Sequence, residues 1–511
     1  MSLQHLCAAL VGAAFVNLLS FPASAAGAAV SAGKHVRPYS ANPSYWQYDG
    51  RPVVLLGGSK EDNLFQEPDL ESHLELLAEV GGNYIRNTMS ARDPGNVQPF
   101  ARLADGRYDL NRWDEEYWRR FERLLTLSQR LGIIVQIEVW DRFDFSGEQW
   151  QINAFNPKHN INYTPQQSGL RESHPEPAET NQQPFFFTTP QQRNNAAVLR
   201  YQQRFVDQML RYALRYPNVL YIIDNETSGD EEWSAYWADY IQQRARQAGV
   251  KVFISEMWDD WDMRAPMHRR TFDHPARYAF VDVSQNTHQR GDMHWQNFNW
   301  VREYLAQRGP RPINTVKTYG ADTGMKKLTR YESAKQWAKR LIGRAPTADV
   351  AGDFGSTNEG IARWWRHLLG GGAGVRFHRP TSGIGLNEEA QQQIRSARLL
   401  LREFNIIRAV PDARHELLSD RAADEAYVTQ IPGEAYAVYF PAGGDVQLHL
   451  PAAGQFVLKW LDLEQARWTA NATVASGRPL RLQPPTTGHW VALITNVYRA
   501  SSAPPNTAAL R

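Results

Sequence analysis

Cysteine is almost absent from this 511-residue sequence, since Cys7 is the only one. It lies in an apolar run, Leu6 to Leu19, that precedes the small residues Ala23-Ser24-Ala25. The run is too short to span a bilayer and, with the small-residue site after it, is typical of a secretory signal peptide. Cleavage would leave a mature chain with no disulfide and no thiolate metal site. We therefore expect an exported protein, periplasmic or extracellular.

A surplus of charge is also missing. Lys and Arg number 56 and Asp and Glu number 54, so the formal net charge is +2. This balance gives no basis for drawing nucleic acid or an anionic membrane onto the whole surface. The sequence has no internal repeat, no His/Cys cluster with metal-ligand spacing, no phosphate-binding loop and no Gly-rich dinucleotide motif. We expect no cofactor, no metal, no nucleic-acid partner and no membrane span after signal cleavage.

Aromatic residues, in contrast, are abundant, with 17 Trp, 21 Tyr and 21 Phe. The Trp share is well above ordinary usage. Flat rings stack on ligands, and the faces of sugars are the commonest such ligand. The composition therefore favours a carbohydrate ligand.

Eight short apolar runs alternate with amphipathic helical stretches between residues 51 and 410. Strands that are covered on both faces are short and mostly apolar, so we predict an α/β fold, a (β/α)8 TIM barrel. The predicted strands are Pro52–Gly58, Asn83–Ser90, Ile133–Asp141, Asn218–Glu226, Val252–Trp258, Ala279–Asn286, Pro312–Tyr319 and Gly374–His378. The predicted helices are Leu70–Val80, Trp113–Leu131, Gln191–Tyr216, Glu231–Ala248, His294–Gln307, Ile361–Leu369 and Asn387–Phe404.

Two segments depart from this alternation. Phe143–Thr189 is rich in Asn, Gln, Pro and aromatic residues, and such a long connection on a barrel lies at its catalytic end. Beyond about Pro411, short alternating runs punctuated by Gly and Pro predict a small antiparallel β-sandwich. The expected organisation is a signal peptide (1–26), a lead-in (27–50), the barrel (51–410), the sandwich (411–498) and a disordered tail (499–511).

The C-terminal ends of the predicted strands carry carboxylates, amides and Trp rings. Catalytic groups on this fold come from these ends and the loops beyond them. Glycoside cleavage needs one carboxyl group to protonate the departing oxygen and a second to attack the sugar or activate water. A single carboxylate at such a position can equally cap the next helix or pair with a nearby Arg.

Two short motifs carry a resemblance to a known group of enzymes. The strand that ends in Asn225-Glu226 resembles the acid/base signature of the fourth strand in clan A glycoside hydrolases. The segment from Gly82 to Arg86 is similar to the clan's entry into its second strand. The resemblance implies that Glu226 donates the proton, that Asn225 holds a sugar hydroxyl and that Arg86 lies beneath the catalytic pair. The C-terminal module resembles β domains labelled as collagen-binding.

The seventh strand departs from the clan pattern. Lys317 stands where the resemblance implies a nucleophilic Glu. Either another carboxylate partners Glu226, or the alignment of this strand is displaced, or hydrolysis with retention has been lost. We prefer Glu256, because neighbouring strands about 4.8 Å apart can bring two carboxyl groups within range. Second choices are Glu138, Asp141, Asp353 and Glu359, of which Glu359 also fits a helix cap.

Cationic and aromatic side chains at the strand ends suggest how a sugar is held. Lys317 and the nearby Arg and His residues favour a carboxylated or sulfated sugar, or else neutralise the acids around them. We expect Lys317 to be charged and either to bind an acidic group of the substrate or to hold Glu256 ionised. The expected substrate-binding residues are Arg86, Glu138, Trp140, Asp141, Asn225, Trp258, Asn286, Lys317, Tyr319, His378 and Arg379, with Arg376 and Trp261 nearby.

These observations predict an exported glycoside hydrolase that acts on a polysaccharide or oligosaccharide, with Glu226 and Glu256 as its catalytic residues. One alternative is a barrel that binds carbohydrate or a protein such as collagen without catalysis. A second carboxylate near Glu226, in a site open to solvent, distinguishes the hydrolase from the binder. Another alternative is a polysaccharide lyase with Lys317, Tyr319 or His288 as its base.

Overall fold

The structure is a computed structural model that describes residues 35–322, 355–450, 454–475 and 477–497. The predicted signal peptide, the predicted tail and Asp353 lie outside these residues. Within the described ranges, no helix has the length and apolar character needed to cross a bilayer.

The predicted lead-in contains strands that were not predicted from the sequence. β1 (Arg37–Tyr39), β2 (Asn42–Tyr48) and β3 (Arg51–Val53) form a small antiparallel sheet. Trp46 of β2 is fully buried against Phe253 and Phe280, two residues that precede barrel strands. This sheet therefore covers the N-terminal end of the barrel.

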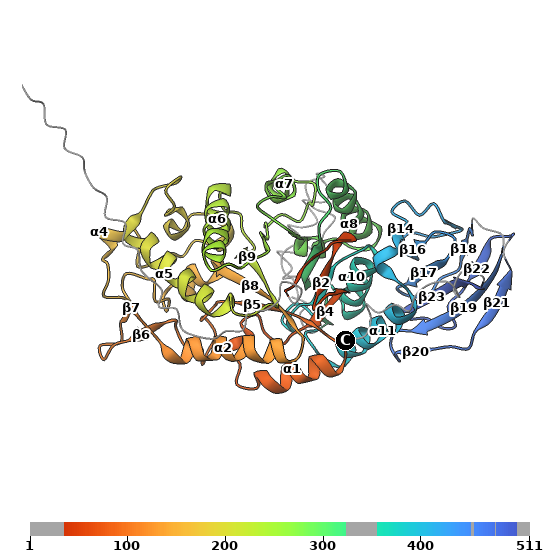
Figure 1. Cartoon of the computed structure of the whole chain (residues 1–511), viewed down its shortest axis with the longest axis horizontal. Helices are drawn as coiled ribbons and strands as arrows, with labels where there is room; N and C mark the ends of the chain where they lie inside the picture. The colour runs from red at the N-terminus through yellow and green to blue at the C-terminus, as the bar shows by residue number, and fades with distance from the viewer. Residues whose placement is uncertain (1–34, 323–354, 451–453, 476, 498–511) are drawn as a thin grey trace, which may run out of the picture.

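The predicted barrel is confirmed. Eight parallel strands lie in the order β10-β9-β8-β5-β4-β13-β12-β11, which follows the chain around the barrel (Figure 1). Between the two end strands, β10 and β11, the backbone N–H of Ala279 donates to the carbonyl of Ile254 at 3.0 Å and nearly closes the barrel. The strands are β4 (Leu55–Gly58), β5 (Tyr84–Thr88), β8 (Ile134–Asp141), β9 (Val219–Asn225), β10 (Ile254–Ser255), β11 (Val281–Asp282), β12 (Ile313–Thr318) and β13 (Gly374–Phe377).

All seven predicted helices are present, and the described residues contain a further helix between β10 and β11, α7 (Pro266–Phe272). α7 has only seven residues, so it is too short for a helical period to be recognised. The predicted helices are α1 (Leu70–Glu79), α2 (Glu115–Arg130), α5 (Ala196–Ala213), α6 (Glu231–Gln247), α8 (Gly291–Ala306), α10 (Thr357–Leu369) and α11 (Glu388–Glu403).

The long connection after β8 folds into short turns, and a hairpin of β6 (Phe100–Arg102) and β7 (Tyr108–Trp113) lies beside it. The connection includes α3 (Gly147–Trp150), α4 (Pro165–Ser168) and the 3-10 turn η3 (Ala178–Thr180). The Ser228 hydroxyl, just after β9, donates to the carbonyl of Glu179 in η3 at 2.7 Å. As expected, the insertion lies at the C-terminal end of the barrel.

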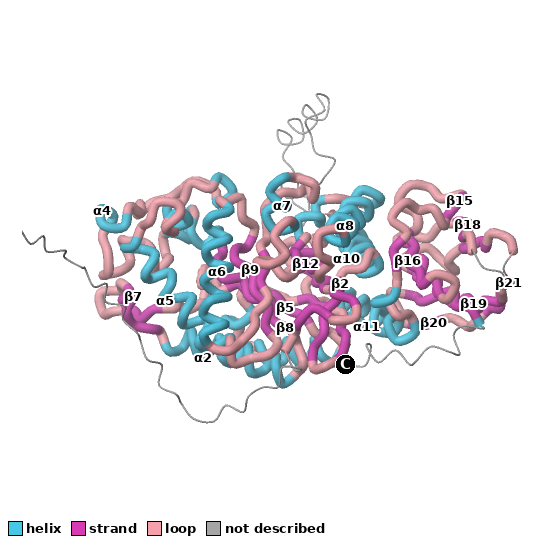
Figure 2. The backbone as a smooth tube through the Cα atoms, turned by 45° about the horizontal axis from the view of Figure 1, so that its top comes forward, coloured by secondary structure: helices cyan, strands magenta, loops and turns pink. Residues whose placement is uncertain are grey.

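The C-terminal strands form two antiparallel sheets that pack face to face (Figure 2). Alternate residues of the larger sheet face the smaller sheet, and the others face helices α10 and α11 of the barrel. Tyr439 stacks on Trp365 of α10 with ring centroids 5.9 Å apart. The strands are β14 (Val410–Pro411), β15 (Leu418–Ser419), β16 (Tyr427–Ile431), β17 (Ala435–Phe440), β18 (Val446–Leu448), β19 (Gln455–Asp462), β20 (Arg467–Trp468), β21 (Ala472–Ala475), β22 (Leu480–Leu482) and β23 (Trp490–Asn496).

Candidate active site

Glu226 follows the last residue of β9, at the C-terminal end of the barrel. Its φ angle of 49° lies in the left-handed region, which is energetically costly for a residue with a side chain. The side chain remains 14% exposed, although the strand before it is fully buried. Strained backbone and solvent access at one carboxylate are typical of a functional position.

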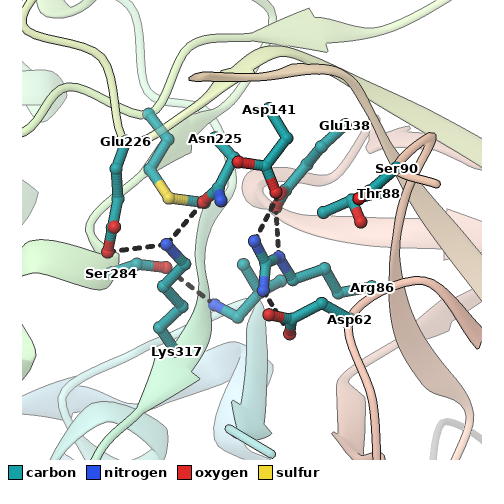
Figure 3. A network of polar contacts seen from close by, with 12 residues as sticks. Asp62, Arg86, Thr88, Ser90, Glu138, Asp141, Asn225, Glu226, Ser284 and Lys317 are labelled. Carbon is teal, nitrogen blue, oxygen red and sulfur yellow. Dashed lines mark hydrogen bonds and ion pairs between the residues drawn. The ribbon is translucent and has the colours of Figure 1, made fainter. Parts of the chain in front are cut away.

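Two residues of β12 and its end hold this carboxylate in place, and Figure 3 shows the contacts of the first, Lys317. Lys317 Nζ lies 2.6 Å from Glu226 Oε1 and also donates to Asn225 Oδ1 at 2.5 Å. The Tyr319 hydroxyl donates to the same oxygen, Oε1, at 3.0 Å. Within the described part of the chain, no hydrogen bond reaches the second oxygen, Oε2. Glu226 is therefore fixed through one oxygen and presents the other.

The charge state of Glu226 follows from this arrangement. Burial acts to raise its pKa, but the charge and hydrogen bond of Lys317, with smaller effects from Arg86 and His288, lower the pKa to about 2. Glu226 is therefore an ionised carboxylate at neutral pH. The general-acid role expected for Glu226 needs a proton on this carboxyl group, which the low pKa disfavours.

Asp259 is a second carboxyl group beside Glu226, and it was not among the residues predicted for the site. Its backbone N–H donates to the carbonyl of Thr227 at 2.8 Å, and the N–H of Thr227 donates to the carbonyl of Met257 at 2.8 Å. Burial and the negative charge of Glu226 raise the pKa of Asp259 to about 7, against the opposing charge of Lys317. Asp259 is half-buried and thus partly open to solvent.

The alternation of side chains along an extended segment could have indicated Asp259. Residues two apart share a face, so Glu256 and Trp258 point one way while Met257 and Asp259 point the other. The residues predicted for the site, Glu256 and Trp258, belong to the face that turns away from Glu226.

Glu256 is not the partner of Glu226. Its Oε1 accepts from the backbone N–H groups of Asp224 and Met257, both at 2.9 Å, and Ser234 of α6 contacts it as well. Burial and the nearby charge of Asp224 raise the pKa of Glu256 well above its usual range. Glu256 is therefore a buried group that joins β9 and β10 to α6, and Lys317 contacts Glu226 instead of it.

Arg86 lies beneath the site in a buried ion-pair network (Figure 3). Its guanidinium group contacts Glu138 through two nitrogens, each at 2.7 Å, and also pairs with Asp62. His378 Nε2 lies 3.3 Å from Arg86 and 3.4 Å from Asp62. Burial lowers the pKa of His378 to about 3, so its ring is neutral. The network connects strand ends below Glu226. Its members are buried, apart from Arg379, which pairs with Asp62 and is partly exposed.

The expected cationic mouth is largely neutralised. Arg379 pairs with Glu61 and Asp62, each at 3.2 Å, and Arg376 is buried and donates to the carbonyl of Val316 at 2.6 Å. These pairs favour the interpretation in which the cations balance neighbouring acids over the one in which they select an acidic sugar.

Three further residues that were expected in or near the site serve the surrounding structure. Asp141 is buried and pairs with Arg92 at 2.6 Å. Glu359 donates its backbone N–H to the Ser356 cap of α10 and pairs with Arg366, as the helix-cap interpretation predicts. Trp140 is 2% exposed and lies among aromatic rings of the insertion, α5 and α6, namely Phe145, Phe155, Phe185, Phe205, Trp233 and Trp237.

Trp258 and Asn286 also face away from Glu226. Trp258 Nε1 donates to Thr271 of α7 at 2.7 Å, and the Asn286 amide donates to the carbonyl of His294 in α8 at 3.1 Å. Both residues are buried. Trp261, in contrast, is 42% exposed two residues beyond Asp259, so it is the ring of this loop that can stack on a ligand.

In the part of the chain that the structure describes, no group of three or more His, Cys, Asp or Glu side chains could hold a metal ion. A surface cavity of about 420 Å³ lies apart from Glu226, between the loop that follows β4 and helix α2. Neither Glu226 nor Asp259 is among the residues that line it.

Comparison with known proteins shows the fold. No protein-family model and no curated protein matches the sequence. The chain is similar to a glycoside hydrolase family 5 structure from Bacteroides vulgatus ATCC 8482, with a TM-score of 0.60 and 11% identity over 92% of this chain and 97% of that one. A second structure, described as a glycoside hydrolase, has a TM-score of 0.55 and 11% identity over 91% and 98% of the two chains. The structural likeness that the clan A resemblance implied is therefore present, while the collagen-binding label of the C-terminal module stays a prediction.

Proposed function

We propose that this protein is a glycoside hydrolase that cleaves a polysaccharide or oligosaccharide at the C-terminal end of the barrel. The observation that carries the proposal is the pair Glu226 and Asp259, two partly exposed carboxyl groups whose surroundings shift their pKa values in opposite directions. Glycoside cleavage requires one ionised and one protonated carboxyl group at neutral pH. The likeness in fold to glycoside hydrolase structures supports the same reaction.

A barrel that only binds carbohydrate has no need for such a pair. Aromatic rings and neutral hydrogen-bonding groups would be enough for its site. A strained, ion-paired carboxylate would lower the stability of the fold without improving the binding of a sugar. The presence of Asp259 beside Glu226 supports the hydrolase over the binder.

The test is a panel of neutral and acidic glycans incubated with the wild-type protein and with Glu226→Gln. We expect the wild type to release reducing sugar from at least one glycan and Glu226→Gln to lose at least about 10²-fold of that rate. Glu232→Gln, the same change at an exposed position of α6, is the control and should keep full activity.

Equal turnover by wild type and Glu226→Gln would contradict the proposal. Binding of a glycan without release of any product would identify a binder. Unsaturated products that absorb in the ultraviolet would identify a lyase.

A further inference from the structure

We infer that Asp259 is the proton donor of this cleavage and that Glu226 is the carboxylate that attacks the sugar, the reverse of the role that the clan A resemblance implies for Glu226. The inference rests on the proposed function and assigns the roles within its site. It also explains how a barrel with Lys317 on β12, in place of a carboxylate, retains two catalytic groups.

The backbone places the two residues on adjacent extended segments. Residue 227 pairs in parallel with residue 258, and hydrogen bonds of 2.8 Å flank that pair on both sides. Glu226 precedes the pair on one segment and Asp259 follows it on the other. The two residues are therefore diagonal neighbours, whose Cα atoms lie about 7–8 Å apart, and side chains of this length can bring their carboxyl groups within the roughly 5–9 Å that glycoside cleavage uses.

The contacts of Glu226 are those that an attacking carboxylate needs. Lys317 and Tyr319 both bind Oε1, so the charge is held and oriented through one oxygen. The other oxygen, Oε2, is the one to meet the anomeric carbon. A group locked to a lysine in this way is poorly suited to deliver and recover protons, because its ionised form is strongly favoured.

The charged groups around Asp259 favour its protonated form. Glu226 faces it from the end of β9, Glu179 from η3 and Asp260 from its own loop, while Lys317 on β12 is the opposing positive charge. Burial and the three negative neighbours together outweigh Lys317. Asp259 therefore carries its proton up to about pH 7, the range in which a general acid is most effective.

The reaction then has two balanced steps. In the first, Glu226 Oε2 forms a bond to the anomeric carbon as the bond from that carbon to the leaving oxygen breaks, and Asp259 gives its proton to that oxygen. In the second, the Asp259 carboxylate takes a proton from water, the water oxygen bonds to the anomeric carbon, and Glu226 is released. The product keeps the configuration of the substrate.

Asp259→Asn tests this assignment, with Asp420→Asn, the same change at an exposed position beside the C-terminal sheets, as the matched control. The readout is the rate on aryl glycosides whose leaving groups range from dinitrophenolate to phenolate. In kcat/KM, which reports the first step, a proton donor matters only for poor leaving groups. We therefore expect kcat/KM of Asp259→Asn to fall about 10²–10⁴-fold on phenyl glycosides and little on dinitrophenyl glycosides. The alkaline limb of the wild-type pH profile, near pH 7, should also disappear, and Asp420→Asn should behave as wild type.

Added azide gives a second readout that does not depend on the size of the rate loss. With the dinitrophenyl substrate, Asp259→Asn should form the glycosyl azide of the same configuration as the substrate, because azide needs no proton transfer to attack the sugar bound to Glu226. A change that merely damaged the fold would not produce this product.

Two results would overturn the assignment. The first is a wild-type rate of Asp259→Asn on phenyl glycosides, or a leaving-group dependence that appears in Glu226→Gln instead. Either finding would show that Asp259 is not the proton donor, while the proposed function would stand. A wild-type protein that cleaves no glycoside at all would overturn the proposed function and this inference with it.

Discussion

At the scale of single residues, Lys317 explains why Glu226 is ionised. The lysine is 3% exposed, and its ammonium group contacts both Asn225 and Glu226. If that charge is removed, burial becomes the dominant influence on Glu226 and favours its protonated form. Lys317 is thus a positioning residue, which acts through Glu226.

Lys317→Met keeps the length of the side chain and removes its charge. Because activity requires ionised Glu226 and Lys317 lowers its pKa, the variant should raise the acid limb of the pH profile by about 1–3 pH units. Neutral and acidic substrates should lose activity to the same extent. Profiles of kcat/KM against pH on both kinds of substrate provide the measurement.

Lys317→Arg, which retains the charge, is the control for this prediction and should leave the acid limb near its wild-type position. If Lys317→Met weakened only acidic substrates and left the acid limb in place, the lysine would bind substrate and would not hold Glu226.

The residues of the site could be predicted in part. Glu226, Asn225 and Lys317 come together as the strand assignment implies, because each lies at a strand end of the same barrel. Glu256 and Trp258 were assigned to the site wrongly, since the sequence does not reveal which face of a short segment turns inward after its strand has ended. The protonation states depend on distances between residues that are far apart in the chain, so no local sequence pattern predicts these states.

At the scale of elements, the end of β12 is held against helix α10 by a close backbone approach. Gly320 has a φ angle of +130°, and a Cβ atom there would lie 2.5 Å from Gly360 Cα in α10. Its N–H donates to the carbonyl of Ser382 at 2.8 Å. Since Tyr319 immediately precedes it, this contact determines where the Tyr319 hydroxyl meets Glu226.

Gly320→Ala should therefore reduce both stability and activity. The backbone strain and the clash with α10 should lower the free energy of unfolding by about 2–4 kcal/mol, and kcat/KM should fall as Tyr319 moves. Gly249→Ala is the control, because Gly249 has a φ angle of +72° and a Cβ atom there would meet no described atom within 4 Å. That variant should cost about 1 kcal/mol and leave kcat/KM unchanged.

Denaturant unfolding curves and rates on one substrate measure both effects. Similar stability losses for the two variants, with unaltered kcat/KM for Gly320→Ala, would show that the approach of β12 to α10 does not control the site.

The elements themselves were largely predictable, because the buried strands and amphipathic helices have distinct periods. The exceptions are short. β10 and β11 have two residues each where longer strands were predicted, since the chain turns out of the barrel after Ser255 and enters the 3-10 turn Ser284–His288 after β11.

At the scale of the whole molecule, the barrel and the C-terminal sheets share one apolar core. Tyr427, Tyr439 and Leu493 of the larger sheet belong to the same buried cluster as Trp365 and Leu369 of α10. Trp295 Nε1 of α8 also donates to the carbonyl of Asp412 at 3.2 Å. The C-terminal sheets therefore brace the barrel on the side of α8, α10 and α11 (Figure 1). The alternation of apolar and polar residues predicts such strands, but it does not reveal which of their two faces covers the barrel.

The central claim is that a glycosidic bond is cleaved at Glu226, and trapping of the intermediate tests it most directly. The whole chain would be incubated with an activated 2-deoxy-2-fluoro glycoside of a sugar that it cleaves, and its intact mass and labelled peptide would be determined. We predict one sugar bound per chain, attached to Glu226, and no label on Glu226→Gln. A label on another residue, or turnover without any label and with inverted product, would contradict the account.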